Sequence, residues 1–278
     1  MKILLYAHGG SKNHGCEAIV RSTRLLLGDN NQITLLSYVP DEDKYYKLDD
    51  IVNICGEVNS INKKTFEFLV SYFEQKLFKN YHHMDALQHK DAINKLDNDY
   101  DYAFFIGGDN YCYSDVKNYS YINKYIRKKA KRTVLWGCSV EPEILNDKCI
   151  RNDIQKFSLI VARESISYDA LSKINKNTHL LPDPAFFLPI EKIDLPLQMT
   201  NSETIGINIS PLIFKYGNED LILQSFLNLI KYILNNSSDN IALIPHVVWD
   251  HNDDYNVIKR LYEMIGNDDR VMIIGDHN

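Results

Sequence analysis

A glycine-rich loop near the amino terminus is the first feature of this sequence that could do chemistry. It runs from Gly9 to Glu17 as GGSKNHGCE and follows the apolar run at 3–7. Glycines let backbone N–H groups approach a ligand closely, and the start of a helix after such a loop favours a bound anion. The loop fits neither G-x-G-x-x-G nor G-x-x-x-x-G-K-S/T, so neither a dinucleotide site nor a P-loop is indicated. Two interpretations stay open, a plain tight connection or a ligand site lined by Gly10, Asn13, Gly15 and Glu17.

A second pair of glycines, Gly107 and Gly108, follows the apolar run at 102–106. The carboxyl ends of parallel strands meet at one edge of a sheet, and ligands bind there in open α/β folds. We therefore expect the two glycine loops to border one crevice. Asp109 would orient a sugar hydroxyl or act as a base in that crevice, and Asn110 would contact the substrate. The alternative for Asp109 is to cap the next helix.

A strand-like run at 159–162 ends in a polar cluster that starts with Arg163 and includes Ser165. An arginine at a strand end can hold a carboxylate or phosphate through two parallel hydrogen bonds. The other interpretation of Arg163 is a salt bridge to Glu164 or Asp169. We place Arg163 among the catalytic candidates and Ser165 among the substrate-binding ones.

Three more strand ends add candidate residues. Cys138 and Ser139 follow an apolar run and are candidates for substrate binding. No histidine lies near Cys138, so we expect a packed thiol and not a nucleophile. In the second half of the chain, apolar runs end at Asn208 to Ser210 and at His246. His246 could act as a general acid or donate to a phosphate, although a lone histidine is often structural.

Strand-like runs alternate with amphipathic segments through the first two thirds of the chain. Such alternation predicts βαβ units and a parallel sheet. The segment 61–96 differs, because it reads as two helices joined at Lys79-Asn80 without a strand, and we interpret it as an insertion over the sheet. The predicted strands are 3–7, 33–38, 102–106, 133–136 and 159–162, and the predicted helices are 16–27, 118–131, 144–156 and 165–174.

A cluster of four prolines between 182 and 201 separates two halves of the sequence. This density of proline is incompatible with a long helix and typical of an interdomain crossing. We therefore predict a first lobe at 1–188 and a second at 189–278, both Rossmann-like. The second lobe has only three predicted strands, so we expect it to be incomplete and the sequence to be a fragment. Its predicted strands are 204–209, 241–245 and 271–274, and its predicted helices are 219–235 and 251–265.

The composition is that of an ordinary folded protein, with 45% hydrophobic and 24% charged residues among 278. A net charge of -6 argues against broad electrostatic binding to nucleic acid. No apolar stretch approaches the roughly 18 residues of a membrane span, although peripheral contact stays open. Five cysteines without a C-x-x-C pair indicate neither a disulfide framework nor a zinc site, and we expect a cytoplasmic protein, either free or at the inner face of the membrane.

Six segments, taken in order, resemble the polysaccharide pyruvyl transferase family. That family is similar to GT-B glycosyltransferases, with two Rossmann-like lobes, and its members transfer the enolpyruvyl carbons of phosphoenolpyruvate to a sugar as a ketal. The resemblance spans essentially the whole chain. The segments are NHGCEAI at 13–19, GGDNY at 107–111, LWGCS at 135–139, RES at 163–165, PDPAF at 182–186 and PH at 245–246.

The resemblance implies roles for particular residues. Arg163 would meet the carboxylate or phosphate of phosphoenolpyruvate, and Asp183 would lie in the substrate site. The partners implied are phosphoenolpyruvate and a saccharide acceptor, lipid-linked or free, with no other cofactor and no metal. The family also has an Arg-x-His-like motif later in its second lobe, thought to protonate the donor, and these 278 residues contain no such motif. Either the sequence is a fragment and that general acid lies beyond residue 278, or the protein is a degenerate member of the family that lacks it.

Two other functions share this architecture. A GT-B-type nucleotide-sugar glycosyltransferase predicts a nucleotide pocket in the second lobe, and a non-catalytic homologue predicts glycan binding without turnover. Binding of phosphoenolpyruvate, of UDP or of saccharide alone distinguishes the three. The sequence leaves the acceptor sugar, the ketal position and the oligomeric state open.

Overall fold

The computed structural model describes residues 1–56, 61–113, 116–191, 203–266 and 268–275. The chain divides into two compact units, of which the first contains Met1–Ser11 and Gly15–Leu188 and the second Lys12–His14 and Pro189–Asn278. Part of the predicted proline-rich crossing, at 192–201, lies outside the described residues, and so does the chain end at 276–278.

The first unit is built on a seven-stranded sheet in which every pairing is parallel. The predicted parallel α/β sheet is therefore confirmed. Its strand order is β3-β2-β1-β4-β5-β6-β7, so the order reverses between β1 and β4, which is where a crevice opens in such sheets. The strands are β1 (Lys2–His8), β2 (Gln32–Ser37), β3 (Asn53–Gly56), β4 (Tyr100–Phe105), β5 (Ala130–Cys138), β6 (Leu159–Ala162) and β7 (Thr178–Leu180).

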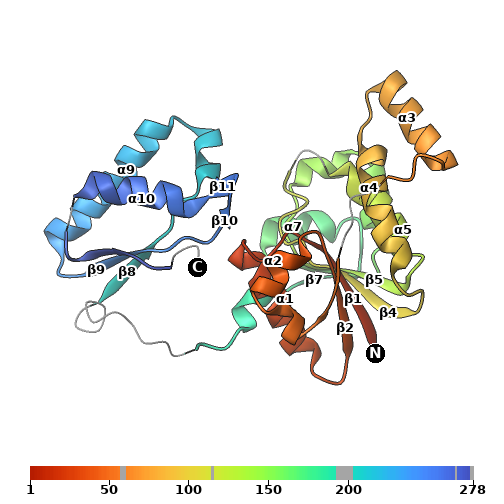
Figure 1. Cartoon of the computed structure of the whole chain (residues 1–278), viewed down its shortest axis with the longest axis horizontal. Coiled ribbons are helices and arrows are strands. Elements are labelled where there is room, and N and C mark those ends of the chain that lie inside the picture. Colours follow the sequence, from red (N-terminus) through yellow and green to blue (C-terminus); the bar gives the residue numbers. More distant parts are fainter. Residues whose placement is uncertain (57–60, 114–115, 192–202, 267, 276–278) are drawn as a thin grey trace. The chain divides into compact units, whose positions relative to one another are not determined.

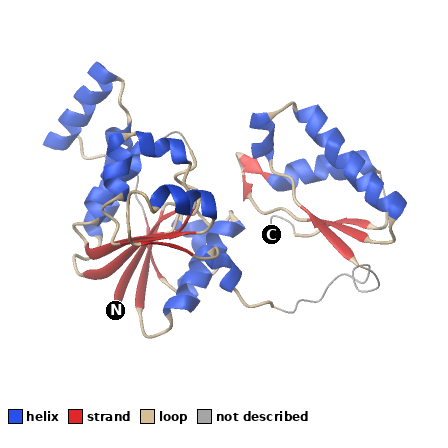
Figure 2. Ribbon diagram, turned by 180° about the vertical axis from the view of Figure 1, so that it is seen from behind, coloured by secondary structure: helices blue, strands red, loops and turns tan. Residues whose placement is uncertain are grey.

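Helices cover both faces of this sheet, as Figure 2 shows for the larger unit. Side chains alternate between faces along each strand. Leu4 and Tyr6 of β1 therefore join one buried cluster, with residues from α4 to α7, while Ile3 and Leu5 join the other, with residues of α1. The helices are α1 (His14–Leu27), α2 (Pro40–Tyr45), α3 (Phe66–Phe78), α4 (His82–Lys95), α5 (Lys117–Ile126), α6 (Lys148–Ile154) and α7 (Ser165–Leu171).

The segment predicted as an insertion forms the two expected helices, α3 and α4. They connect β3 to β4, and α4 supplies buried Ala86, Leu87 and Ile93 to the main core. Figure 1 shows α4 lying along α5, while α3 extends away from the sheet. Helix α4 is therefore a crossover helix of the parallel sheet, and α3 is an addition to it.

The predicted helix 165–174 ends at Leu171, and two other predicted helices of this unit are also shorter in the structure. The first ends at Ile126, because β5 already begins at Ala130. The other is divided, because Pro142–Asn146 is a 3-10 helix and the side chain of Asp147 then caps a new helix, α6. The Oδ1 of Asp147 accepts from the backbone N of Cys149 at 2.8 Å, which fixes the start of α6 at Lys148, six residues after Pro142.

The second unit has a three-stranded parallel sheet with the order β12-β9-β8. Helices α9 and α10 connect these strands and share one buried cluster with them. The predicted helix 251–265 starts only at Asp254, because a short antiparallel hairpin takes the preceding residues. The elements are β8 (Thr204–Ile207), α9 (Glu219–Asn236), β9 (Asn240–Leu243), β10 (Val248–Trp249), β11 (Asn252–Asp253), α10 (Asp254–Ile265) and β12 (Val271–Ile273).

Candidate functional site

Arg163 lies where the loops after β5, β6 and β7 converge. Its Nε donates to Oγ of Ser139 at 2.7 Å, and its Nη1 donates to Oδ2 of Asp183 at 2.8 Å. Its backbone N donates to the carbonyl oxygen of Cys138 at 3.1 Å. The guanidinium is thus fixed by two side chains from neighbouring strand ends, and its side chain remains 25% exposed.

The β4 loop reaches the same guanidinium through Gly108. A Cβ atom at Gly108 would lie 2.7 Å from Nη1 of Arg163, so only a glycine leaves room for this approach. The carbonyl oxygen of Gly108 also accepts from the backbone N of Ser139 at 2.7 Å. Among the described residues, no hydrogen bond or ion pair engages Nη2 of Arg163. That edge of the guanidinium can therefore meet an anion.

Gly107 and Asn110 join the β4 loop to β1. The Nδ2 of Asn110 donates to the carbonyl oxygen of Ala7 at 3.0 Å, and a Cβ at Gly107 would lie 1.8 Å from that Nδ2. Ala7 itself has a φ of 64°, a left-handed conformation that is uncommon for alanine. Asn110, proposed from sequence as a substrate contact, therefore makes a structural contact at the carboxyl end of β1, next to β4.

Asp109 is exposed beside this junction. Its Oδ2 accepts a hydrogen bond from the hydroxyl of Tyr113 at 2.8 Å. The cap residue of α5 is Val116, which offers no side-chain cap, so the capping interpretation of Asp109 is wrong. Burial raises the pKa of the Cys16 thiol to about 12, and the Asp109 carboxylate adds to that rise. Asp109 therefore influences the glycine loop that follows β1.

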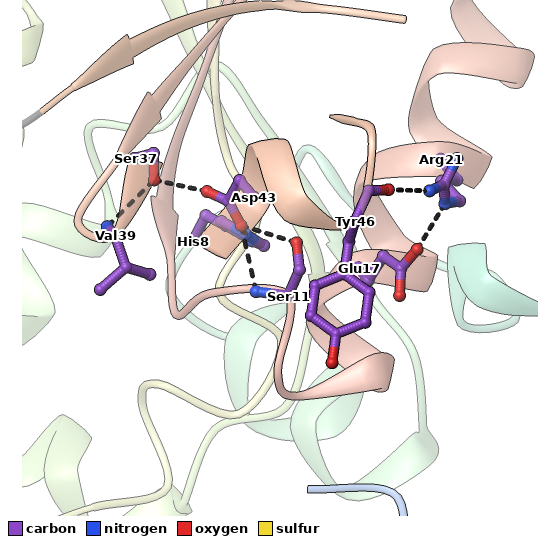
Figure 3. Close-up of polar contacts among 8 residues, drawn as sticks. All are labelled: His8, Ser11, Glu17, Arg21, Ser37, Val39, Asp43 and Tyr46. Carbon is purple, nitrogen blue, oxygen red and sulfur yellow. Dashed lines mark hydrogen bonds and ion pairs between the residues drawn. The ribbon is translucent and has the colours of Figure 1, made fainter. Parts of the chain in front are cut away.

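The start of that loop is held by a buried carboxylate, Asp43 of α2, shown in Figure 3. Its Oδ1 lies 2.9 Å from Nε2 of His8 and accepts from the backbone N of Ser11 at 3.0 Å and the Ser11 hydroxyl at 2.6 Å, while Oδ2 accepts from Ser37. Burial acts to raise the pKa of Asp43, but these hydrogen bonds outweigh it and the pKa is lowered. Asp43 was not among the residues singled out from sequence, because its acidic stretch reads as an exposed helix start.

The remaining candidates of this loop have different surroundings. Gly10 has a φ of 114°, and a Cβ there would lie 2.6 Å from Oε1 of Glu42, so this position requires glycine. Glu17 accepts from Nε of Arg21 at 2.7 Å, an ion pair within α1 that Figure 3 also shows. Asn13 forms an isolated antiparallel bridge with Val247 and belongs, with its neighbours, to the second unit. Gly15 is exposed at the start of α1.

The alternative partners considered for Arg163 are wrong. Glu164 instead caps α7, accepting from the backbone N of Ile166 and of Ser167, and Asp169 makes no contact with the arginine. Ser165 is the exposed first residue of α7. Asp183 is the partner, and its Oδ1 also accepts from the backbone N of Ala185 at 2.9 Å.

Cys138 is a packed thiol, as expected. It is fully buried, and burial raises its pKa to about 12. A thiol that stays protonated near neutral pH is a poor nucleophile. The described residues contain no group of three or more His, Cys, Asp or Glu that could hold a metal ion.

In the second unit, the buried carboxylate of Asp254 organises the strand ends. Its Oδ2 accepts from Nδ2 of Asn208 at 2.9 Å and from the backbone N of both His246 and Val247 at 3.0 Å. Asn208 also donates to the carbonyl oxygen of Ile244, so it ties β8 to β9. Asp254 begins α10 and resembles an ordinary first-turn acid in the sequence, so no local pattern marks it as a buried residue.

His246 and Ser210 are the other candidates of this unit. His246 is exposed directly after β9, and only its backbone is held by Asp254. Ser210 caps a short 3-10 helix, where its Oγ accepts from the backbone N of Leu212 at 3.3 Å. Ser210 therefore has a structural role, while the imidazole of His246 is accessible to solvent.

Solved structures with the same fold share little sequence with this chain. HepE of Anabaena, solved in complex with UDP and glucose, has a TM-score of 0.52 and 12% identity over 100% of this chain and 70% of its own. A putative UDP-N-acetylglucosamine 2-epimerase from Listeria monocytogenes has a TM-score of 0.54 and 11% identity over 100% and 69%. S. aureus MnaA, solved with UDP, has a TM-score of 0.53 and 7% identity over 98% and 67%.

These likenesses show a GT-B-type fold, as predicted, and at such low identity they show the fold alone. No curated protein matches the chain. A family model described as polysaccharide pyruvyl transferase matches residues 13–278. Because this match covers nearly the whole sequence, the chain belongs to the polysaccharide pyruvyl transferase family.

Proposed function

We propose that this protein transfers the pyruvyl group of phosphoenolpyruvate to a saccharide acceptor and forms a pyruvate ketal. The observation that carries the proposal is the position of Arg163 at the strand ends. Ser139 and Asp183 fix its guanidinium, and its Nη2 edge is not engaged within the described part of the chain. A guanidinium presented in this way suits the carboxylate or phosphate of the donor.

The reaction requires one proton to be delivered to the methylene carbon of the donor, and two sugar hydroxyls to bond to its C2 and lose their protons. Protonation of the methylene carbon of phosphoenolpyruvate turns C2 into an oxocarbenium-like centre, which one sugar hydroxyl attacks. A second hydroxyl then replaces the phosphate at C2. Of the two hydroxyl protons, one leaves with the phosphate and the other replaces the proton consumed at the methyl group. Arg163 would stabilise the negative charge of the donor and of the departing phosphate.

Asp109 and His246 are the proposed proton carriers. The Asp109 carboxylate is exposed and accepts from Tyr113, so as a base it can orient a sugar hydroxyl and take its proton. The imidazole of His246 is exposed, while Asp254 fixes its backbone, so it can deliver a proton as an acid. Both roles are inferred from the exposure of the side chain and from its acid–base chemistry.

A ligand-binding comparison tests the proposal. Thermal unfolding of the chain is measured with phosphoenolpyruvate, with UDP and with UDP-glucose, since a ligand at a hundred times its Kd adds about 2.7 kcal/mol of stability. We expect stabilisation by phosphoenolpyruvate that is lost in Arg163→Gln. Arg132→Gln is the matched control, because Arg132 lies on β5 far from that strand's carboxyl end and its guanidinium donates to the Tyr102 hydroxyl at 3.2 Å.

The other outcomes point to the alternatives. Stabilisation by UDP and not by phosphoenolpyruvate would replace the proposal with nucleotide-sugar glycosyl transfer. Binding of saccharide without either donor would indicate a glycan-binding homologue. We further propose a cytoplasmic location and an acceptor that is a cell-surface polysaccharide or its precursor, free or lipid-linked. Among the described residues, no helix has the length and apolar character needed to span a bilayer.

A further inference from the structure

The outward side of helix α3 is apolar. Phe66, Leu69, Phe73 and Leu77 recur at helical spacing and are all exposed, Phe66 by 79% and Leu77 by 70%. Figure 1 shows α3, in orange, extending away from the sheet of the first unit. Three aromatic residues on or next to this helix are exposed as well, namely Tyr72, Phe78 and Tyr81. We call these seven side chains the α3 apolar face.

Three polar residues of α3, Glu67, Ser71 and Glu74, face the rest of the unit. Glu67 pairs with Lys90 of α4, and Oε2 of Glu74 lies 3.0 Å from Nδ1 of His83, also on α4. Ser71, which is buried, donates to a backbone carbonyl within α3. A surface helix of a globular protein normally buries its apolar side and exposes its polar side. On α3, Phe68 packs against the core, but four large apolar side chains of another side of the helix are exposed. These exposed residues are available for contact with something outside this unit.

The size of the α3 apolar face supports this reading. A large aromatic side chain offers about 150–250 Å² of surface, so the seven residues together expose on the order of 700 Å². Monomeric soluble proteins rarely expose a contiguous apolar patch of more than a few hundred Å². Solvent exposure of this face carries a free-energy cost that a partner surface would remove.

The charges around the face decide what that partner is. Four lysines lie at its edges and are exposed, while both acidic residues of α3 are engaged with α4. One of the lysines, Lys76, places its Nζ 5.7 Å from the ring of Tyr72, as an amphipathic side chain does at an interface. We call these four lysines the lysine fringe; their positive charges lie in a chain whose net charge is -6. The four lysines are Lys63, Lys64, Lys76 and Lys79.

We propose that the α3 apolar face is a docking surface for an anionic lipid bilayer, on which α3 lies flat. Aromatic and leucine side chains would enter the acyl boundary, and the lysines would meet anionic headgroups. A second copy of the chain fits less well, because a two-fold contact would press the same lysine fringe against itself. The inference goes beyond the proposed transfer reaction and does not depend on the donor.

Vesicle flotation of the whole chain tests the inference. Vesicles of phosphatidylcholine are compared with vesicles that also contain phosphatidylglycerol. We expect binding to the anionic vesicles, weakened at least tenfold in Phe66→Ser/Leu77→Ser, since each buried side chain of this kind contributes roughly 1.5–3 kcal/mol. The matched control is Leu221→Ser/Tyr232→Ser on α9, whose side chains are 69% and 67% exposed, and it should bind as the wild type does.

A charge variant tests the proposed contact between the lysines and anionic headgroups. Lys63→Gln/Lys76→Gln should weaken binding to the anionic vesicles roughly thirtyfold and leave the thermal unfolding temperature unchanged, because both lysines are exposed. The inference is overturned if the wild type binds neither vesicle, or if the α3 variant binds like the α9 control. It is also overturned if sedimentation shows a wild-type dimer that Phe66→Ser/Leu77→Ser dissociates. Phosphoenolpyruvate binding by the α3 variant should equal that of the wild type, which separates this test from that of the reaction.

Discussion

Removing the charge of Asp183 while keeping its shape should tighten the binding of phosphoenolpyruvate. Asp183 now neutralises Arg163 through a 2.8 Å contact, so an incoming anion meets a paired guanidinium. Asp183→Asn leaves a carbonyl oxygen that can still accept from the backbone N of Ala185. The variant therefore releases the positive charge of Arg163 without removing the cap that holds the loop after β7.

The size of the effect follows from the geometry. A unit charge about 6 Å from a ligand anion contributes roughly 2.8 kcal/mol at an effective dielectric constant of about 20. Both side chains are partly exposed, 25% and 19%, so screening by solvent and salt reduces this to about 1–1.5 kcal/mol. That corresponds to a Kd lower by about tenfold. The lost ion pair should lower stability by about 1 kcal/mol.

Isothermal titration with phosphoenolpyruvate measures this change. Asp169→Asn is the matched control, because Asp169 is an exposed acid of α7 in the same unit and the net charge changes by the same amount. We expect tighter binding in Asp183→Asn alone, with a smaller difference at high salt. A folded Asp183→Asn variant with unchanged or weaker affinity would refute the reasoning, since Arg163 would then be a structural ion pair only.

Three further predictions follow from buried contacts near the strand ends. Gly108→Ala should weaken phosphoenolpyruvate binding more than tenfold, measured by titration. The added Cβ would lie only 2.7 Å from Nη1 of Arg163, so the guanidinium must move. Asp43→Asn should lower stability by about 2–4 kcal/mol at pH 7. The pKa of Asp43 in the folded protein lies below its ordinary value of 3.8, so the contribution of Asp43 to stability is complete above pH 3.8. This contribution is lost as the pH falls below 3.8 and through the folded pKa, so the unfolding temperatures of wild type and variant should converge at such low pH. Cys138→Ser should bind phosphoenolpyruvate unchanged, and iodoacetamide at pH 8 should label exposed Cys149 well before Cys138.

Much of the sheet could be predicted from sequence, because its central strands are continuous apolar runs. Residues 3–7 and 103–106 are buried, as central parallel strands are. The edge strands β3 and β7 were missed, because they have four and three residues and are only half covered. Their sequences, NICG and THL, carry no apolar run, so only pairing with a neighbour makes them strands.

The candidate site was partly predictable for a related reason. Arg163 and the paired glycines stand directly after strands, so the parallel sheet alone places them at one edge. What the sequence could not show is which polar groups pair with one another. The contact of Arg163 with Asp183 spans twenty residues, and that of His8 with Asp43 spans thirty-five. Such pairs depend on strand order, which no local pattern encodes.

Whether phosphoenolpyruvate binds at Arg163 is best decided by a crystal structure of the chain soaked with phosphoenolpyruvate. We expect donor density at the carboxyl ends of β4, β5 and β6, with a carboxylate or phosphate oxygen within hydrogen-bond distance of Nη2 of Arg163. Donor density elsewhere in the molecule, or none at Arg163 under saturating phosphoenolpyruvate, would contradict this expectation.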